Sequence, residues 1–200
     1  MKILFLLVIL FQLQAIARAD VLQSFKSDGC SMYPDGLPLV EENKWVHCCV
    51  THDMAYWVGG KKEEKLKADA LLGQCVAEQT SELHGNLMEL GVLAGGLPNS
   101  GLPWRWGYGF ENGRSYKTMT LEEKKMHFEK FDGIIYEIER LSPDLTLDQV
   151  SYMLARFEFQ RHLLAVDLKL PSEVEMQSYD KRLEIVYKIY NRDSVLFPED

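Results

Sequence analysis

The stretch HCCVTHDMAYWVGG, His47–Gly60, decides how this 200-residue chain folds. Two adjacent cysteines precede a His–Asp pair and a tyrosine, and two glycines end the segment. A glycine pair is a strong helix-ending signal, so the stretch is predicted to close a helix over Glu41–Val58. Such a helix holds either a metal site of thiols and imidazoles or an oxidised scaffold that presents a histidine. The choice between them depends first on the redox state of the cysteines.

The N-terminus predicts export. MKILFLLVILFQLQAIARAD contains a lysine, an apolar run over Ile3–Phe11, and small residues at Ala17 and Ala19. This order of features is typical of a cleaved secretory signal peptide, and the apolar run is too short to be a stable membrane anchor. We therefore expect residues 1–19 to be a signal peptide and the mature protein to be secreted or periplasmic.

The charge balance is acidic. The chain has 22 basic and 30 acidic residues, a formal net charge of −8, and removing Lys2 and Arg18 with the signal peptide leaves 20 against 30, or −10. This balance disfavours non-specific binding to nucleic acid, so no nucleic-acid partner is expected. No protein partner is identifiable from the sequence.

The four cysteines are expected to form disulfides. They are Cys30, Cys48, Cys49 and Cys75, and an even number in an exported chain indicates a disulfide framework. A zinc site is disfavoured because adjacent cysteines on a helix point about 100° apart and no C-x-x-C is present. A bond between the neighbours Cys48 and Cys49 would need a strained ring, so two of the three possible pairings remain open.

The rest of the chain is predicted to be mostly helical. A second helix over residues 61–79 follows the glycine joint and should run antiparallel to the first. Residues 87–110 are glycine-rich, aromatic and almost uncharged. Within them, PWRWGYGF, residues 103–110, predicts a loop whose aromatic side chains pack on the helical core, and the alternative is an interfacial belt at a lipid–water boundary. Capping boxes and apolar stripes predict three further helices, beginning near Thr120, near Thr146 and after Pro171. We expect an all-α fold with a disulfide-linked helix pair within residues 20–115 and a helical extension over residues 116–200, packed on it or beside it.

One of the two open pairings gives each disulfide a role. If Cys48 bonds to Cys75, His52 lies about 6 Å beyond the bond on one helix, and Asp69 about 9 Å away in the same direction on its antiparallel neighbour. Asp69 is then expected near His52 and Tyr56. A carboxylate beside a histidine orients the ring and stabilises its protonated form, as a general base requires.

The second bond of this pairing, Cys30 to Cys49, has its own consequence. It fixes the loop DGCSMYPDG, residues 28–36, one helical turn before Asp53. Loop carbonyls that face a single carboxylate form an all-oxygen site, which is the environment that calcium prefers. The sequence thus predicts a His/Asp dyad beside a candidate calcium site.

These residues resemble the active-site core of the secreted phospholipase A2 family, in its compact, microbial-type form. The family motif is C-C-x-x-H-D-x-C-Y, followed on the next helix by C-D and a cysteine six residues after the aspartate. The matching residues here are Cys48, Cys49, His52, Asp53, Tyr56, Asp69 and Cys75. Ala55 and Ala68 replace two family cysteines that bond to each other, so no thiol is left unpaired. The matched span runs from about Asp28 to Val76.

The resemblance implies calcium-dependent hydrolysis of the sn-2 ester of phospholipids, with a phospholipid membrane surface as substrate. His52 would be the general base for the attacking water, and Asp69 and Tyr56 would support it. Asp53 would bind Ca²⁺ through its carboxylate. The remaining metal ligands implied are the backbone carbonyls of Gly29, Ser31 and Tyr33.

The loop departs from the family pattern. The family has C-G-x-G-G where this chain reads CSMYPDG, so Ser31 and Tyr33 stand at glycine positions. Glycine allows backbone conformations that other residues rarely adopt. The alternative function is therefore a non-catalytic, phospholipase A2-like secreted protein that binds lipid or protein, and a third is hydrolysis of another ester by the same dyad.

Overall fold

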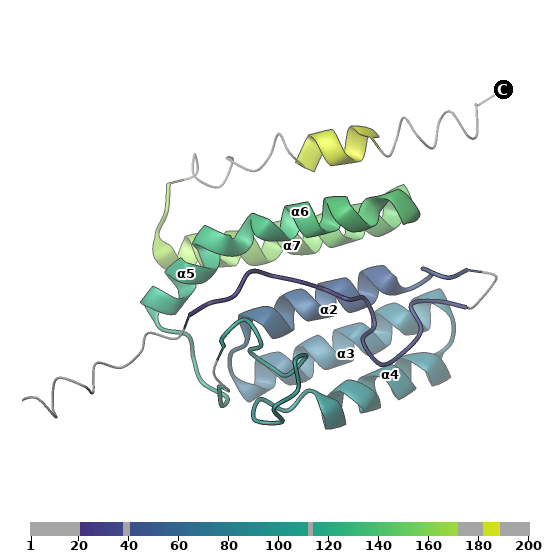
Figure 1. Cartoon of the computed structure of the whole chain (residues 1–200), viewed down its shortest axis with the longest axis horizontal. Helices are drawn as coiled ribbons and strands as arrows, with labels where there is room; N and C mark the ends of the chain where they lie inside the picture. The colour runs from purple at the N-terminus through teal and green to yellow at the C-terminus, as the bar shows by residue number, and fades with distance from the viewer. Residues whose placement is uncertain (1–20, 38–40, 112–113, 172–181, 189–200) are drawn as a thin grey trace, which may run out of the picture.

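The structure is a computed structural model that describes residues 21–37, 41–111, 114–171 and 182–188 (Figure 1). The expected signal peptide, residues 1–19, lies outside these ranges, as does most of the helix expected after Pro171, of which residues 182–188 are described and helical. The described chain is mainly helical, and its only β interactions are two isolated bridges. Within it, no helix is long and apolar enough to span a membrane.

Helices α2 (Val46–Val58) and α3 (Lys62–Gln79) form the predicted pair. The first begins at Val46 rather than Glu41, because Glu41 forms a β-bridge with Leu37 and residues 42–45 form a turn. A disulfide joins Cys48 to Cys75, and a hydrogen bond joins His52 to Asp69 further along. From Cys48 to His52 the contacts move forward along α2, whereas from Cys75 to Asp69 they move backward along α3. The two helices are therefore antiparallel. The second disulfide joins Cys30 to Cys49. Of the two pairings left open by the sequence, the structure has the one in which one bond joins the two helices and the other anchors the loop.

The sequence analysis predicted no helix between residues 79 and 120, yet α4 (Glu82–Gly95) is helical. Ser81 caps this helix by accepting a hydrogen bond from the backbone N–H of His84. Its glycines serve close packing: a Cβ on Gly85 would lie 2.2 Å from the carbonyl oxygen of Gly73 on α3. The glycines of this segment therefore bring two helices into contact instead of marking a loop. Residues 96–110 contain no regular helix, and the predicted loop within them, residues 103–110, packs Trp106 and Phe110 into the interior.

The extension contains α5 (Leu121–Phe131), α6 (Gly133–Leu141), the short 3-10 helix η2 (Ser142–Asp144) and α7 (Leu147–Leu168). Thr120 and Thr146 form the predicted capping boxes of α5 and α7. The apolar stripe that runs through Phe131 and Ile135 is divided between two helices at Asp132. In Figure 1, α6 and α7 lie along one side of the molecule and α2, α3 and α4 along the other.

One hydrophobic core joins the helix pair to the extension. Its buried members come from the N-terminal segment, α2, the loop that precedes α5, and the helices of the extension, and include Phe25, Met54, Phe110, Ile135 and Phe157. A second cluster surrounds the two disulfides and includes Leu72, Val76 and Met88. Burial of such side chains stabilises a fold by roughly 1.5–3 kcal/mol each before entropy is counted. The extension thus completes the core that holds α2 in place.

Candidate functional site

His52, Asp69 and Tyr56 meet between α2 and α3. One oxygen of Asp69, Oδ1, lies 3.1 Å from His52 Nε2 and accepts a hydrogen bond from the Tyr56 hydroxyl at 2.7 Å. Their spacing follows from the antiparallel register fixed by Cys48–Cys75. The two rings also stack at a tilt, with centroids 4.1 Å apart. The structure therefore confirms the predicted proximity of these three side chains.

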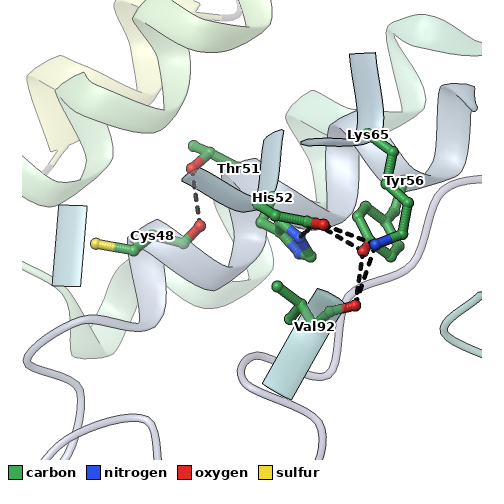
Figure 2. Close-up of polar contacts among 7 residues, drawn as sticks. Cys48, Thr51, His52, Tyr56, Lys65 and Val92 are labelled. Atoms are coloured by element: carbon green, nitrogen blue, oxygen red, sulfur yellow. Dashed lines mark hydrogen bonds and ion pairs between the residues drawn. The ribbon is translucent and has the colours of Figure 1, made fainter. Parts of the chain in front are cut away.

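The site contains a fourth residue, a buried cation, that the sequence analysis missed. Lys65 lies one turn before Asp69 on α3, and its Nζ donates to the other carboxylate oxygen, Oδ2, at 2.6 Å. Only 1% of Lys65 is exposed. Its ammonium also donates to the carbonyl oxygen of Val92 on α4 at 3.1 Å, and Tyr56 donates to the same oxygen at 3.3 Å. Figure 2 shows His52, Tyr56 and Lys65 gathered above this carbonyl.

Asp69 is the charged centre of this cluster. Burial by itself would raise its pKa, but three donors, from His52, Lys65 and Tyr56, outweigh burial and hold the pKa below its usual range. Asp69 is fully buried, and both of its oxygens are hydrogen-bonded. It is therefore an ionised carboxylate at neutral pH, and an ionised carboxylate only accepts hydrogen bonds.

The protonation state of His52 follows from the ionisation of Asp69. Since Asp69 can only accept, Nε2 of His52 carries a proton, and Nδ1 holds the lone pair of the neutral ring. Nδ1 has no hydrogen-bond partner among the described residues. Burial lowers the pKa of His52; hydrogen bonding to Asp69 raises it, the charge of Asp69 raises it further, and the charge of Lys65 lowers it, with a net lowering. The ring is thus neutral at neutral pH and able to accept a proton at Nδ1.

An aromatic residue from the glycine-rich loop closes the cluster. Trp106 is buried and packs edge-on against Tyr56, with ring centroids 5.1 Å apart. Its indole N–H donates to the carbonyl oxygen of Gly60, just after α2. Ala55 and Ala68 belong to the same packed group. The loop therefore packs against Tyr56 through Trp106, in agreement with its predicted packing on the core.

Asp53 lies on the neighbouring face of α2, toward the loop that Cys30–Cys49 anchors. Ser27, another residue that the sequence analysis did not select, donates its hydroxyl to Asp53 Oδ2 at 2.6 Å. Burial raises the pKa of Asp53 well above its usual value, the Ser27 hydrogen bond opposes the rise, and the charges of Asp28 and Asp35 increase it. Asp53 is therefore a carboxyl group whose ionised form the surrounding protein compensates poorly.

The loop of residues 28–36 is folded around Asp35. Its carboxylate accepts the backbone N–H of Cys30 at 2.7 Å, and its pKa is raised by burial. Gly29 adopts a φ of 79°, and a Cβ there would lie 2.3 Å from Asp35 Oδ1, so the turn requires glycine. The side chain of Asp35 thus organises this loop.

The structure places the three residues expected to lend backbone carbonyls within this loop. The N–H of Gly29 donates to the Ser27 hydroxyl that holds Asp53. Ser31 is exposed and adopts a φ of 28°, in the left-handed region that glycine favours. Tyr33 is partly buried, donates its N–H to the carbonyl of Cys30, and lies against the ring of Trp45. The backbone at Ser31 therefore takes a glycine-like conformation although the residue is serine.

The residues around Asp53 fit a hard cation. Within the described part of the chain, the only trio of closely spaced His, Cys, Asp or Glu ligand atoms is His47, Cys48 and Cys75, so the carboxylates near Asp53 do not form such a trio. The sulfurs of Cys48 and Cys75 belong to a disulfide and so cannot bind zinc as thiolates. Around Asp53, by contrast, the side-chain groups are carboxylates and a hydroxyl, which are oxygen donors. Oxygen donors with uncompensated negative charge suit calcium.

Comparison with protein-family models, curated proteins and solved structures finds no match for this chain. The fold and the site define a mainly helical protein with two disulfides and a buried His–Asp–Tyr–Lys cluster.

Proposed function

We propose that this chain is an exported, calcium-dependent phospholipase A2-like enzyme that hydrolyses the sn-2 ester of phospholipids. The observation that carries the proposal is the hydrogen-bonded unit of His52, Asp69 and Tyr56, held across two helices by the Cys48–Cys75 bond. The disulfides suit export, because such bonds persist in oxidising compartments.

His52 would act as the general base. Its Nδ1 lone pair would accept a proton from a water that attacks the ester carbonyl carbon. Asp69 would stabilise the imidazolium formed, while Tyr56 and Lys65 hold the carboxylate in place. Buried charges require such compensation, and here each carboxylate oxygen has it. The proton would then pass from the ring to the departing alcohol oxygen, which restores neutral His52.

The loop and Asp53 would hold the metal. Asp53, with backbone carbonyls of the loop at Gly29, Ser31 and Tyr33, is the ligand set that the resemblance implies. A calcium ion bound there would supply Lewis-acid stabilisation of the negative charge that develops on the carbonyl oxygen. The covalent tie between Cys30 and Cys49 keeps the loop beside α2.

The test is release of fatty acid from phospholipid vesicles. Mature protein is added to mixed phosphatidylcholine and phosphatidylglycerol vesicles that carry a labelled sn-2 acyl chain, with calcium or with EDTA. We expect labelled fatty acid and lysophospholipid with calcium and none with EDTA. A matched lipid with a non-hydrolysable sn-2 ether linkage should release nothing. Vesicle binding without release under either condition would favour the non-catalytic lipid-binding alternative.

Asp53→Asn gives a second test, of the metal site. The pKa of Asp53 is higher in the folded than in the unfolded protein. The free energy of unfolding therefore falls as the pH rises from about 4, the unfolded value, through the raised folded pKa. At neutral pH in EDTA, the variant should therefore melt at a higher temperature than the wild type. Calcium should stabilise only the wild type, by about 2.7 kcal/mol when its concentration is 100 times the Kd.

The measurement is thermal unfolding followed by circular dichroism, with calcium, magnesium or EDTA. Glu111→Gln, an exposed acid outside the loop, is the matched control and should respond to calcium as the wild type does. Equal calcium stabilisation of the wild type and Asp53→Asn would remove Asp53 from the metal site.

A further inference from the structure

A cavity of about 480 Å³ lies between the helix pair and the extension. One wall comes from α2 and α3 and includes Ala55 and Ala68, and the opposite wall comes from Met119 and from Phe159 and Leu163 on α7. None of the opposite wall belongs to the span that resembles a phospholipase A2. The cavity is therefore a feature of the way the extension is added to the helix pair.

The two alanines leave this space open. In the resembled family, both positions carry cysteines that bond to each other, and a disulfide would fill part of the wall. Phe159 and Leu163 remain 55% and 48% exposed although they line the cavity, so an apolar surface is accessible along α7. A volume of this size lies within the range of about 300–1,000 Å³ that is usual for small-molecule sites.

The charges around the cavity favour an anion. Its lining residues include four cations, Lys61, Lys67, Lys124 and Arg156, and two acids, Glu64 and Asp167. Lys124 is paired with Asp167. Lys61, Lys67 and Arg156 form no ion pair with any residue that the structure describes. This net positive lining stands out in a chain whose formal net charge is −8.

Arg156 is the best placed of these cations to receive an anionic group. Its side chain is partly buried, and its guanidinium lies over the ring of Tyr152 and donates to the hydroxyl of that residue at 3.4 Å. These contacts leave other N–H groups of the planar guanidinium for a carboxylate, which it can bind through two parallel hydrogen bonds.

One turn further along α7, Gln160 adds an unfilled polar position. Its side-chain oxygen is buried in the wall and has no hydrogen-bond partner among the residues that the structure describes. Rotation of the Gln160 amide about its Cγ–Cδ bond would place an N–H group where the oxygen now lies. A ligand that combines an apolar chain with one anionic end satisfies this arrangement.

We propose that this cavity binds a fatty acid, with its chain against Ala55, Ala68 and Leu163 and its carboxylate at Arg156. The inference does not depend on the proposed hydrolysis, because a free fatty acid would bind whether or not the chain releases one. His52 also contributes to the lining, so the cavity reaches the candidate site. A fatty acid released there could therefore enter the cavity directly.

Laurate is the probe. Displacement of a fluorescent fatty acid from the mature protein is measured in EDTA, so that no calcium-dependent turnover contributes. Laurate should displace the fluorophore, and 1-dodecanol, which lacks the carboxylate, should do so at least tenfold less well. Arg156→Gln should weaken laurate binding roughly 10- to 150-fold, the range for loss of a hydrogen bond between charged groups. Ala55→Leu, which narrows the cavity where the chain would lie, should weaken laurate binding.

Lys125→Gln is the matched control for loss of charge, because Lys125 is exposed on α5 and is not among the cavity lining. It should bind laurate as the wild type does. Equal displacement by laurate and dodecanol, or unchanged binding by Arg156→Gln, would overturn the assignment even if Ala55→Leu failed to fold. Laurate binding together with a negative vesicle assay would refute only the proposed hydrolysis.

Discussion

Replacing His52 by glutamine should lower sn-2 hydrolysis by about 10²- to 10⁴-fold, the usual contribution of a general base. Glutamine can still donate to Asp69 but has no lone pair of comparable basicity to accept a proton from water. The carboxylate therefore keeps a donor in place of His52 Nε2, and the buried cluster stays satisfied. Initial rates of fatty acid release from calcium-saturated vesicles measure the effect.

The matched control is His162→Gln, which changes an exposed histidine on α7. It should retain wild-type rates. Vesicle binding and the far-ultraviolet circular dichroism of His52→Gln should match those of the wild type, which separates lost chemistry from lost structure. A His52→Gln protein that releases fatty acid at the wild-type rate would show that the base lies elsewhere.

Lys65→Met should destabilise the fold by about 3–5 kcal/mol, the usual cost of removing one partner from a buried ion pair. Lys65 is almost fully buried, and its ammonium compensates Asp69 Oδ2 at 2.6 Å. Methionine fills a similar space without the charge, so the free energy of unfolding reports mainly on the lost pairing. Lys62→Met, on the exposed first turn of the same helix, should change stability by no more than about 0.5 kcal/mol.

The same substitution should raise the pKa of His52. Burial is the largest cause of its lowered pKa, and the positive charge of Lys65 lowers it further, whereas Asp69 raises it. Removing Lys65 leaves the ring facing an uncompensated carboxylate, which favours the imidazolium. The ring-proton shifts of His52, followed by NMR against pH, should titrate at a higher pH in Lys65→Met, and the acid limb of the activity profile should move with them. An unchanged or lower pKa would contradict this coupling.

The sequence predicted the elements whose signals are local. Thr120 and Thr146 each sit three residues before a glutamate or glutamine, and both cap helices as expected. The Gly59–Gly60 joint ends α2, and the pairing of cysteines followed from assigning each bond a role. Helix α4 was missed because the glycines that allow it to approach α3 are the residues that ordinarily indicate a loop.

In the candidate site too, some residues could be predicted from local sequence signals and one depended on tertiary packing. His52, Tyr56 and Asp69 could be placed together because one disulfide fixes the register of two adjacent helices. Lys65 could not be singled out, because a lysine in KKEEKLK ordinarily lies on a solvated face. Its burial depends on α4, which covers that part of α3 and supplies the Val92 carbonyl. Tertiary neighbours that the sequence does not reveal therefore decide which charged residue enters the site.

The two disulfides tie the assembly of the site to cellular location. Cys48 and Cys49 are adjacent on one turn of α2, yet one holds the helix that carries Asp69 and the other holds the loop that faces Asp53. A newly made chain in a reducing cytosol would lack both ties at once. Under the proposed function, a cell that makes this protein would be protected from membrane damage until oxidation after export completes the site.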